Sequence, residues 1–130
     1  LFVCQTGYEH PIEYNLDFLI VSKDETGVDE ANNLIDSKIV KYILLTSSNL
    51  PARLMSLDGT IEIVPPDFKT INSNGAGDAT AAYIAAFGIN DLISNIKKAC
   101  AAGAIVAGTN EKPTIDKINE IAELVDVNPR

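Results

Sequence analysis

The sequence has no tryptophan, one histidine and two cysteines, and these scarcities exclude several classes of protein. A lone His10 and two cysteines far apart in the chain do not supply the ligand set of a structural zinc site. Cys4 and Cys100 lie among apolar or small residues. We therefore expect both to be reduced thiols in the core of a cytoplasmic protein, without a disulfide.

Positive charge is also scarce, because 10 lysines and arginines stand against 18 acidic residues and the formal net charge is −8. A field of this sign repels nucleic acids and anionic membrane surfaces, so neither is expected as a partner. No apolar run approaches the roughly 20 residues of a membrane-spanning helix. The 130 residues, 46% of them hydrophobic, suffice for a single α/β domain over residues 1–130.

The first half of the chain reads as alternating strands and helices. Leu16–Val21 and Tyr42–Thr46 are nearly continuous apolar runs, which is typical of strands covered on both faces. Another short buried strand is expected at Leu1–Cys4. Between the two long runs, Thr26–Asp29 resembles a capping box and predicts a helix. Its expected inward face consists of Val28, Ala31, Leu34 and Ile35.

The second half predicts a hairpin and three helices. Asp58-Gly59 lies between the apolar runs Ala52–Leu57 and Thr60–Val64, which indicates a two-residue hairpin. A first helix is then expected over residues 75–87, with a stop at Gly88. A second is expected from Asn90 or Asp91 onward, and a third after a cap at Thr114. A polar tail is expected at 126–130. The inward residues of the last two helices should be Leu92, Ile93, Ile96, Ala99, Cys100 and Gly103, and Ile115, Ile118, Ile121, Ala122 and Val125. The order of elements predicts a layered α/β fold with a mostly parallel sheet.

The stretch from Thr70 to Ala82 carries the most chemistry. Gly75 and Gly77 flank Ala76, so the backbone can turn sharply and approach a ligand. Free N–H groups at the start of the following helix, with the positive end of its dipole, make an anion site. Asp78 in the first turn can take a proton from a hydroxyl, as phosphoryl transfer to an alcohol requires. An ordinary cap at Asn74 or Asp78 beside a tight glycine turn explains the same residues equally well.

Residues 74–79 read Asn-Gly-Ala-Gly-Asp-Ala and are followed by small residues, Tyr83 and Phe87. This stretch resembles the C-terminal signature of the ribokinase-like (PfkB-type) carbohydrate kinases, and the order of elements resembles that family over most of the chain. The resemblance implies a layered α/β/α domain with a hairpin and three C-terminal helices. It assigns the anion hole to Gly75, Ala76 and Gly77 and the catalytic base to Asp78. Catalytic domains of this family are longer than this chain, which implies a C-terminal nucleotide-binding part or a reduced relative.

The resemblance also implies ligands: ATP and Mg²⁺ as cofactors, and a sugar or nucleoside with a hydroxymethyl group as acceptor. The nucleotide positions of the family fall on Thr46, Asn74, Cys100 and Gly103, and the carboxylates near its magnesium position are Asp24 and Glu25. For Cys100, a packed small apolar residue is the favoured alternative. For Asp24 and Glu25, a solvated loop before a helix is likewise the favoured alternative.

Three positions depart from the family pattern. Lys23 lies in a stretch that lacks the family's asparagine, Ser48 replaces a glycine beside the nucleotide, and Asn72 replaces an aspartate near a monovalent cation. These departures leave room for a non-catalytic relative that binds a nucleotide or a protein partner, and for an unrelated phosphate-binding α/β domain. The kinase interpretation is preferred because the loop and its carboxylate are retained together. Pairing with a missing N-terminal part, or a homo-oligomer, is the expected assembly.

Overall fold

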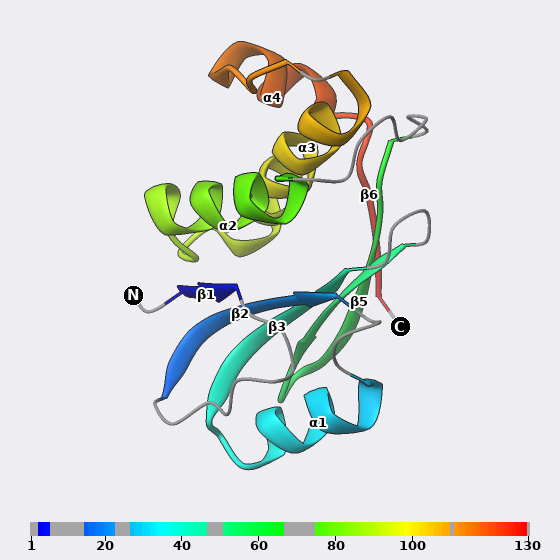
Figure 1. The fold of residues 1–130 in the computed structure, drawn as a ribbon. Helices are drawn as coiled ribbons and strands as arrows, with labels where there is room; N and C mark the ends of the chain where they lie inside the picture. Colours follow the sequence, from blue (N-terminus) through cyan, green and yellow to red (C-terminus); the bar gives the residue numbers. More distant parts are fainter. Residues whose placement is uncertain are drawn as a thin grey trace. The chain divides into compact units, whose positions relative to one another are not determined.

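The computed structural model describes residues 3–5, 15–22, 27–46, 51–66, 75–109 and 111–129, drawn in Figure 1. Packing divides the chain into two compact units. The first comprises Leu1–Glu62 with Asn128–Arg130, and the second comprises Ile63–Val127. The expectation of a single domain over residues 1–130 stays a prediction.

The strands form a sheet in which hydrogen-bonded neighbours follow chain order from β1 to β6. Their bounds are β1 Val3–Gln5, β2 Leu16–Ser22, β3 Val40–Thr46, β4 Ala52–Ser56, β5 Gly59–Val64 and β6 Asp126–Pro129. β2 pairs in parallel with both β1 and β3, whereas β4 runs antiparallel to β3. The predicted α/β class and the long buried strands are confirmed, and β1 lies close to the predicted strand.

Helix α1, Val28–Asp36, packs on the first unit's core as predicted. Ala31 and Ile35 are buried, and Val28 and Leu34 are partly buried beside them. The core cluster consists of Leu19, Val21, Ala31, Ile35, Val40, Ile43, Leu45 and Met55. It places the apolar face of the helix against buried residues of β2, β3 and β4, so burial of that face holds the unit together.

The predicted capping box at Thr26–Asp29 is wrong. The N-cap of α1 is Gly27, which offers no side-chain hydrogen bond, and its carbonyl accepts the Ala31 N–H at 3.1 Å. The helix therefore begins one residue later than a cap at Thr26 would require. Asp29 and Glu30 lie in the first turn instead, where the helix dipole favours negative charge.

The hairpin between β4 and β5 forms, but its turn is one residue earlier than predicted. Leu57 and Asp58 make the turn, and Gly59 already belongs to β5 with φ +128°. The Ser56 hydroxyl closes the turn by accepting the Asp58 N–H at 3.2 Å. Glycine is needed at position 59 because its positive φ is poorly accessible to other residues. The turn leaves Leu57 63% exposed although it is apolar.

The second unit contains the three predicted helices, α2 Ala76–Phe87, α3 Leu92–Thr109 and α4 Ile115–Ala122. α3 packs against both α2 and α4 (Figure 1). Gly88, at φ +80°, ends α2 as predicted. Within the described ranges, no helix is long and apolar enough to cross a membrane.

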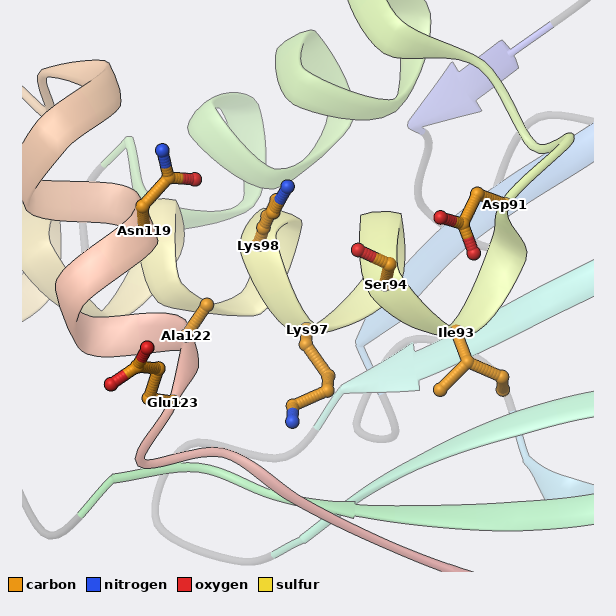
Figure 2. A pocket seen from close by; sticks show the side chains of 8 residues that line it. All are labelled: Asp91, Ile93, Ser94, Lys97, Lys98, Asn119, Ala122 and Glu123. Carbon is orange, nitrogen blue, oxygen red and sulfur yellow. The ribbon is translucent and has the colours of Figure 1, made fainter.

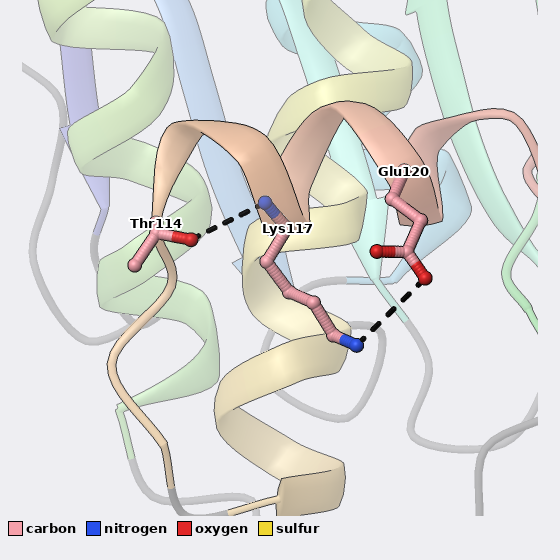
Figure 3. Close-up of polar contacts among 3 residues, drawn as sticks. All are labelled: Thr114, Lys117 and Glu120. Atoms are coloured by element: carbon pink, nitrogen blue, oxygen red, sulfur yellow. Dashed lines mark hydrogen bonds and ion pairs between the residues drawn. The ribbon is translucent and has the colours of Figure 1, made fainter.

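Helix α4 has the predicted cap. The Thr114 hydroxyl accepts the Lys117 N–H at 3.2 Å, and the Lys117 ammonium lies 3.9 Å from the Glu120 carboxylate one turn along (Figure 3). The cap satisfies an N–H group that has no partner inside the helix. The ion pair is solvent-exposed on both sides, so it adds little to stability.

Most of the predicted inward residues of α3 and α4 are buried, Leu92 and Cys100 are partly buried, and two are exposed. Ile93 is 39% exposed and Ile115 is 52% exposed. Both lie in the first turn of their helices. Ile96 and Ile118, one turn further along each helix, are buried, so the first turns of α3 and α4 are less covered than the turns that follow. The predicted apolar stripe is therefore right at its centre and wrong at its start.

The predicted polar tail at residues 126–130 is also wrong, because Asp126–Pro129 forms strand β6. This strand is polar and largely exposed, so its side chains show no apolar alternation. Backbone hydrogen bonds to a neighbouring strand stabilise it, and those leave no mark on side-chain composition. The strand could therefore not be predicted from the pattern of apolar residues in the sequence.

Candidate functional site

The Gly75–Asp78 stretch forms the N-terminal end of α2. Gly75 is the N-cap residue in a left-handed conformation, with φ +84° and ψ −8°. The first hydrogen bond of the helix runs from the Ala79 N–H to the Gly75 carbonyl at 3.0 Å. The N–H groups of Gly75, Ala76, Gly77 and Asp78 precede that bond and have no acceptor in the helix. Because Gly75 has no side chain to cap them, they can bind an anion.

Asp78 is the third residue of α2 and its side chain is exposed. Its carboxylate therefore belongs to the same helical turn as the free amides and is open to a ligand from solvent. A donor set for an anion and an exposed carboxylate on one turn are the two parts needed for proton removal beside a phosphoryl group. The structure places the predicted base and the predicted anion hole on one rigid element.

Thr46 belongs to the first unit, at the end of β3. Its hydroxyl donates to the Val21 carbonyl of β2 at 3.3 Å, which ties the ends of the two parallel strands together. The proton of this hydroxyl is thus used within the sheet, and only its lone pairs can receive a donor from a ligand.

Of the remaining predicted site residues, only Gly103 and Cys100 lie within the described ranges. Gly103 is buried in the contact between α3 and α2, and Cys100 is only partly exposed on α3. Asn74, Asp24 and Glu25 lie outside the described residues, as do the departures at Lys23, Ser48 and Asn72. Among described residues, no group of three or more histidine, cysteine or acidic side chains could hold a metal ion.

Burial raises the pKa of the Cys100 thiol from 9.0 to about 12. The group is therefore a neutral thiol at physiological pH, as the alternative of a packed apolar residue requires. We expect iodoacetamide at pH 8 to label Cys100 about a thousandfold more slowly in the folded chain than in the urea-unfolded chain, because alkylation needs the thiolate. Mass spectrometry of the Cys100 peptide measures both rates. Equal rates would show that the thiol is accessible and ionisable.

A separate groove of about 610 Å³ lies between α3 and α4 and contains none of the predicted site residues. Figure 2 shows that Lys97 and Lys98 point away from each other, with Asp91 and Glu123 toward the groove's ends. Positive charge does not converge there, and the acidic side chains offset it. The groove therefore has no arrangement suited to a phosphate.

Thr80 is a residue of this region that the sequence analysis missed. It is 5% exposed and is the one buried polar residue in the described ranges. Its hydroxyl donates to the Ala76 carbonyl, one helical turn earlier, at 3.1 Å. A threonine within an alanine-rich helix, three residues after the last glycine of the loop, is the signal that could have found it, since threonine can bond back to the preceding turn.

Solved structures with a similar arrangement show the fold. A protein assigned as a phosphofructokinase from Staphylococcus aureus matches with a TM-score of 0.74 and 22% identity over 92% of this chain. Phosphofructokinase-2 from Escherichia coli, solved with substrates and products, matches with a TM-score of 0.71 and 19% identity over 93% of it. This chain has the fold of the ribokinase-like kinases. The predicted fold class is confirmed.

A third structure with the ribokinase-like fold, assigned as ribokinase II from Escherichia coli and solved with ATP and Mg²⁺, matches with a TM-score of 0.70 and 18% identity over 83% of this chain. The chain spans 44%, 46% and 39% of the length of these three proteins, less than half in each case. No protein-family model and no curated protein matches the sequence. The ribokinase-like fold therefore rests on structural similarity.

Proposed function

We propose that this chain forms the nucleotide-binding part of an ATP-dependent kinase that phosphorylates the hydroxymethyl group of a sugar or nucleoside. The observation that carries the proposal is the first turn of α2, where free amides and the exposed Asp78 occur together in a ribokinase-like fold. The chain spans less than half of the matched kinases, so acceptor contacts would come from a further part.

The proposed chemistry divides between backbone and side chain. The carboxylate of Asp78 accepts the proton of the acceptor hydroxyl. At the same time the hydroxyl oxygen bonds to the γ-phosphorus of ATP, and the bond from that phosphorus to the ADP oxygen breaks. The amides of Gly75, Ala76 and Gly77 donate to the phosphoryl oxygens and stabilise their negative charge. The helix dipole adds to this stabilisation at the same end.

Magnesium would be held by few protein ligands. Mg²⁺ commonly uses one or two carboxylates together with substrate phosphates, so the lack of a three-ligand cluster among described residues is compatible with it. Asp24 and Glu25 are the residues proposed to hold it. When bound, the ion neutralises phosphate charge. This matters here because a net charge of −8 otherwise repels a nucleotide.

Calorimetric titration of ATP, with and without Mg²⁺, tests the proposal. We expect saturable, magnesium-dependent binding to the parent chain in the micromolar to millimolar range, and similar binding to Asp78→Asn, because the amides and not the carboxylate hold the phosphates. No binding to a chain that circular dichroism shows to be folded would contradict an autonomous nucleotide site. Binding without ADP formation from any sugar or nucleoside would favour the non-catalytic alternative.

A further inference from the structure

A hydrogen bond from the Thr80 hydroxyl stabilises the first turn of α2. The Ala76 carbonyl that accepts the Thr80 hydroxyl belongs to the residue at the centre of the glycine loop. A buried hydroxyl needs such a partner, because an unsatisfied one loses its hydrogen bonds to water without replacement. The bond therefore holds the Ala76 peptide in one orientation, and with it the amides of the same turn.

Helix α3 packs closely against the same two groups, the Thr80 hydroxyl and the Ala76 carbonyl. A Cβ atom added to Gly103 would lie 2.5 Å from the Thr80 Oγ1 atom and 3.1 Å from the Ala76 carbonyl oxygen. The first distance is far below any normal contact, so a side chain at position 103 would displace Thr80 or the turn itself. A Cβ atom added to Gly75 would lie 3.7 Å from the side chain of Val106, which is one turn further along α3. The backbone of α3 thus fits against the loop because position 103 is glycine.

We propose that Thr80 and Gly103 are positioning residues, which together fix the direction of the α2 amides and of the Asp78 carboxylate. This inference rests on the proposed function, and it assigns Gly103 a contact with the loop and not with the nucleotide. Its physical reason is that groups displaced by about 1 Å from their productive place can lose about a hundredfold in rate. Two independent contacts, a hydrogen bond and a helix crossing, converge on one peptide group.

Four variants of the full chain test the proposal. Thr80→Val replaces the hydroxyl by a methyl of similar size, whereas Thr80→Ser keeps the hydrogen bond. Gly103→Ala introduces the Cβ, and Gly103→Ala combined with Thr80→Ala removes the closest atom that this Cβ would meet. Gly27→Ala is the matched control, because a Cβ there has nothing within 4 Å and the position belongs to the other unit.

Two measurements are read for each variant, namely the ¹⁵N–¹H resonances of residues 75–79 and the affinity for ATP with Mg²⁺. We expect Gly103→Ala to shift those resonances and to weaken ATP binding at least tenfold, and Thr80→Val to do the same to a smaller extent. Thr80→Ser should restore the parent spectrum, and the double variant should be less impaired than Gly103→Ala alone. Gly27→Ala should leave both measurements unchanged.

Some results would overturn the proposal. If Thr80→Val and Gly103→Ala lose thermal stability while their resonances at 75–79 and their ATP affinity match the parent, the two residues only pack the helices. Should Gly103→Ala fail to fold, the isosteric Thr80→Val decides alone. If the parent itself does not bind ATP, the proposed function fails, and the resonances of residues 75–79 still decide whether Thr80 and Gly103 hold the turn.

Discussion

Asparagine in place of Asp78 is expected to lower kcat for magnesium-dependent ADP formation by about 10²–10⁴-fold. The amide has nearly the shape of the carboxylate but cannot take a proton from the acceptor hydroxyl. Because Asp78 is exposed and caps no other group by the bonds described above, the fold and the nucleotide affinity should be preserved. A coupled assay of ADP release, with the acceptor found by screening sugars and nucleosides, measures the effect.

Asp116→Asn is the matched control for this variant. Asp116 is likewise an exposed carboxylate in the first turn of a helix of the same unit, so its removal changes net charge and helix-dipole energy in the same way. We expect Asp116→Asn to retain the parent kcat. Near-normal turnover of Asp78→Asn would show that another group removes the proton.

Truncation of Ile43 to alanine is expected to lower the free energy of unfolding by about 2–5 kcal/mol. Ile43 lies in the middle of β3, is 0% exposed and belongs to the core cluster that joins β2, β3 and α1. The loss combines the transfer energy of the deleted groups with the cavity they leave. Denaturant unfolding followed by circular dichroism measures it.

Leu57→Ala is the control in the same unit. It also shortens an apolar side chain, but Leu57 projects from the hairpin turn into solvent. A change within about 0.5 kcal/mol is expected there. If Ile43→Ala cost no more than Leu57→Ala, β3 would not be a central strand of a packed core.

The parts of the fold that depend on apolar burial could be predicted from the sequence. β2 and β3 follow from continuous apolar runs, and the three C-terminal helices follow from their spacing and from Gly88 and Thr114 as boundary signals. The capping box near α1 and the turn after β4 were misplaced by one residue. At α1 the cap is Gly27 in place of Thr26, and in the hairpin Gly59, which was predicted as a turn residue, already belongs to β5.

The candidate site was predictable to a similar degree. The glycine loop running into a helix with Asp78 in its first turn follows from local chemistry, and the structure confirms that geometry. The place of Gly103 could not be inferred, because a missing side chain serves a ligand contact and a close helix crossing equally well. The packing distances to Thr80 and Ala76 show the close helix crossing.

The division of the chain into units has a consequence for its synthesis. The second unit is one continuous segment, Ile63–Val127, whereas the first needs residues from both sides of it, up to Asn128 and beyond. A ribosome delivers residues in order, so the segment made later can finish folding before the segment made first. We therefore expect nascent chains released early to contain a finished helical cluster and an unfinished sheet. The segment Ile63–Val127 is expected to fold before the first unit is complete, the reverse of the usual order in which the N-terminal unit folds first.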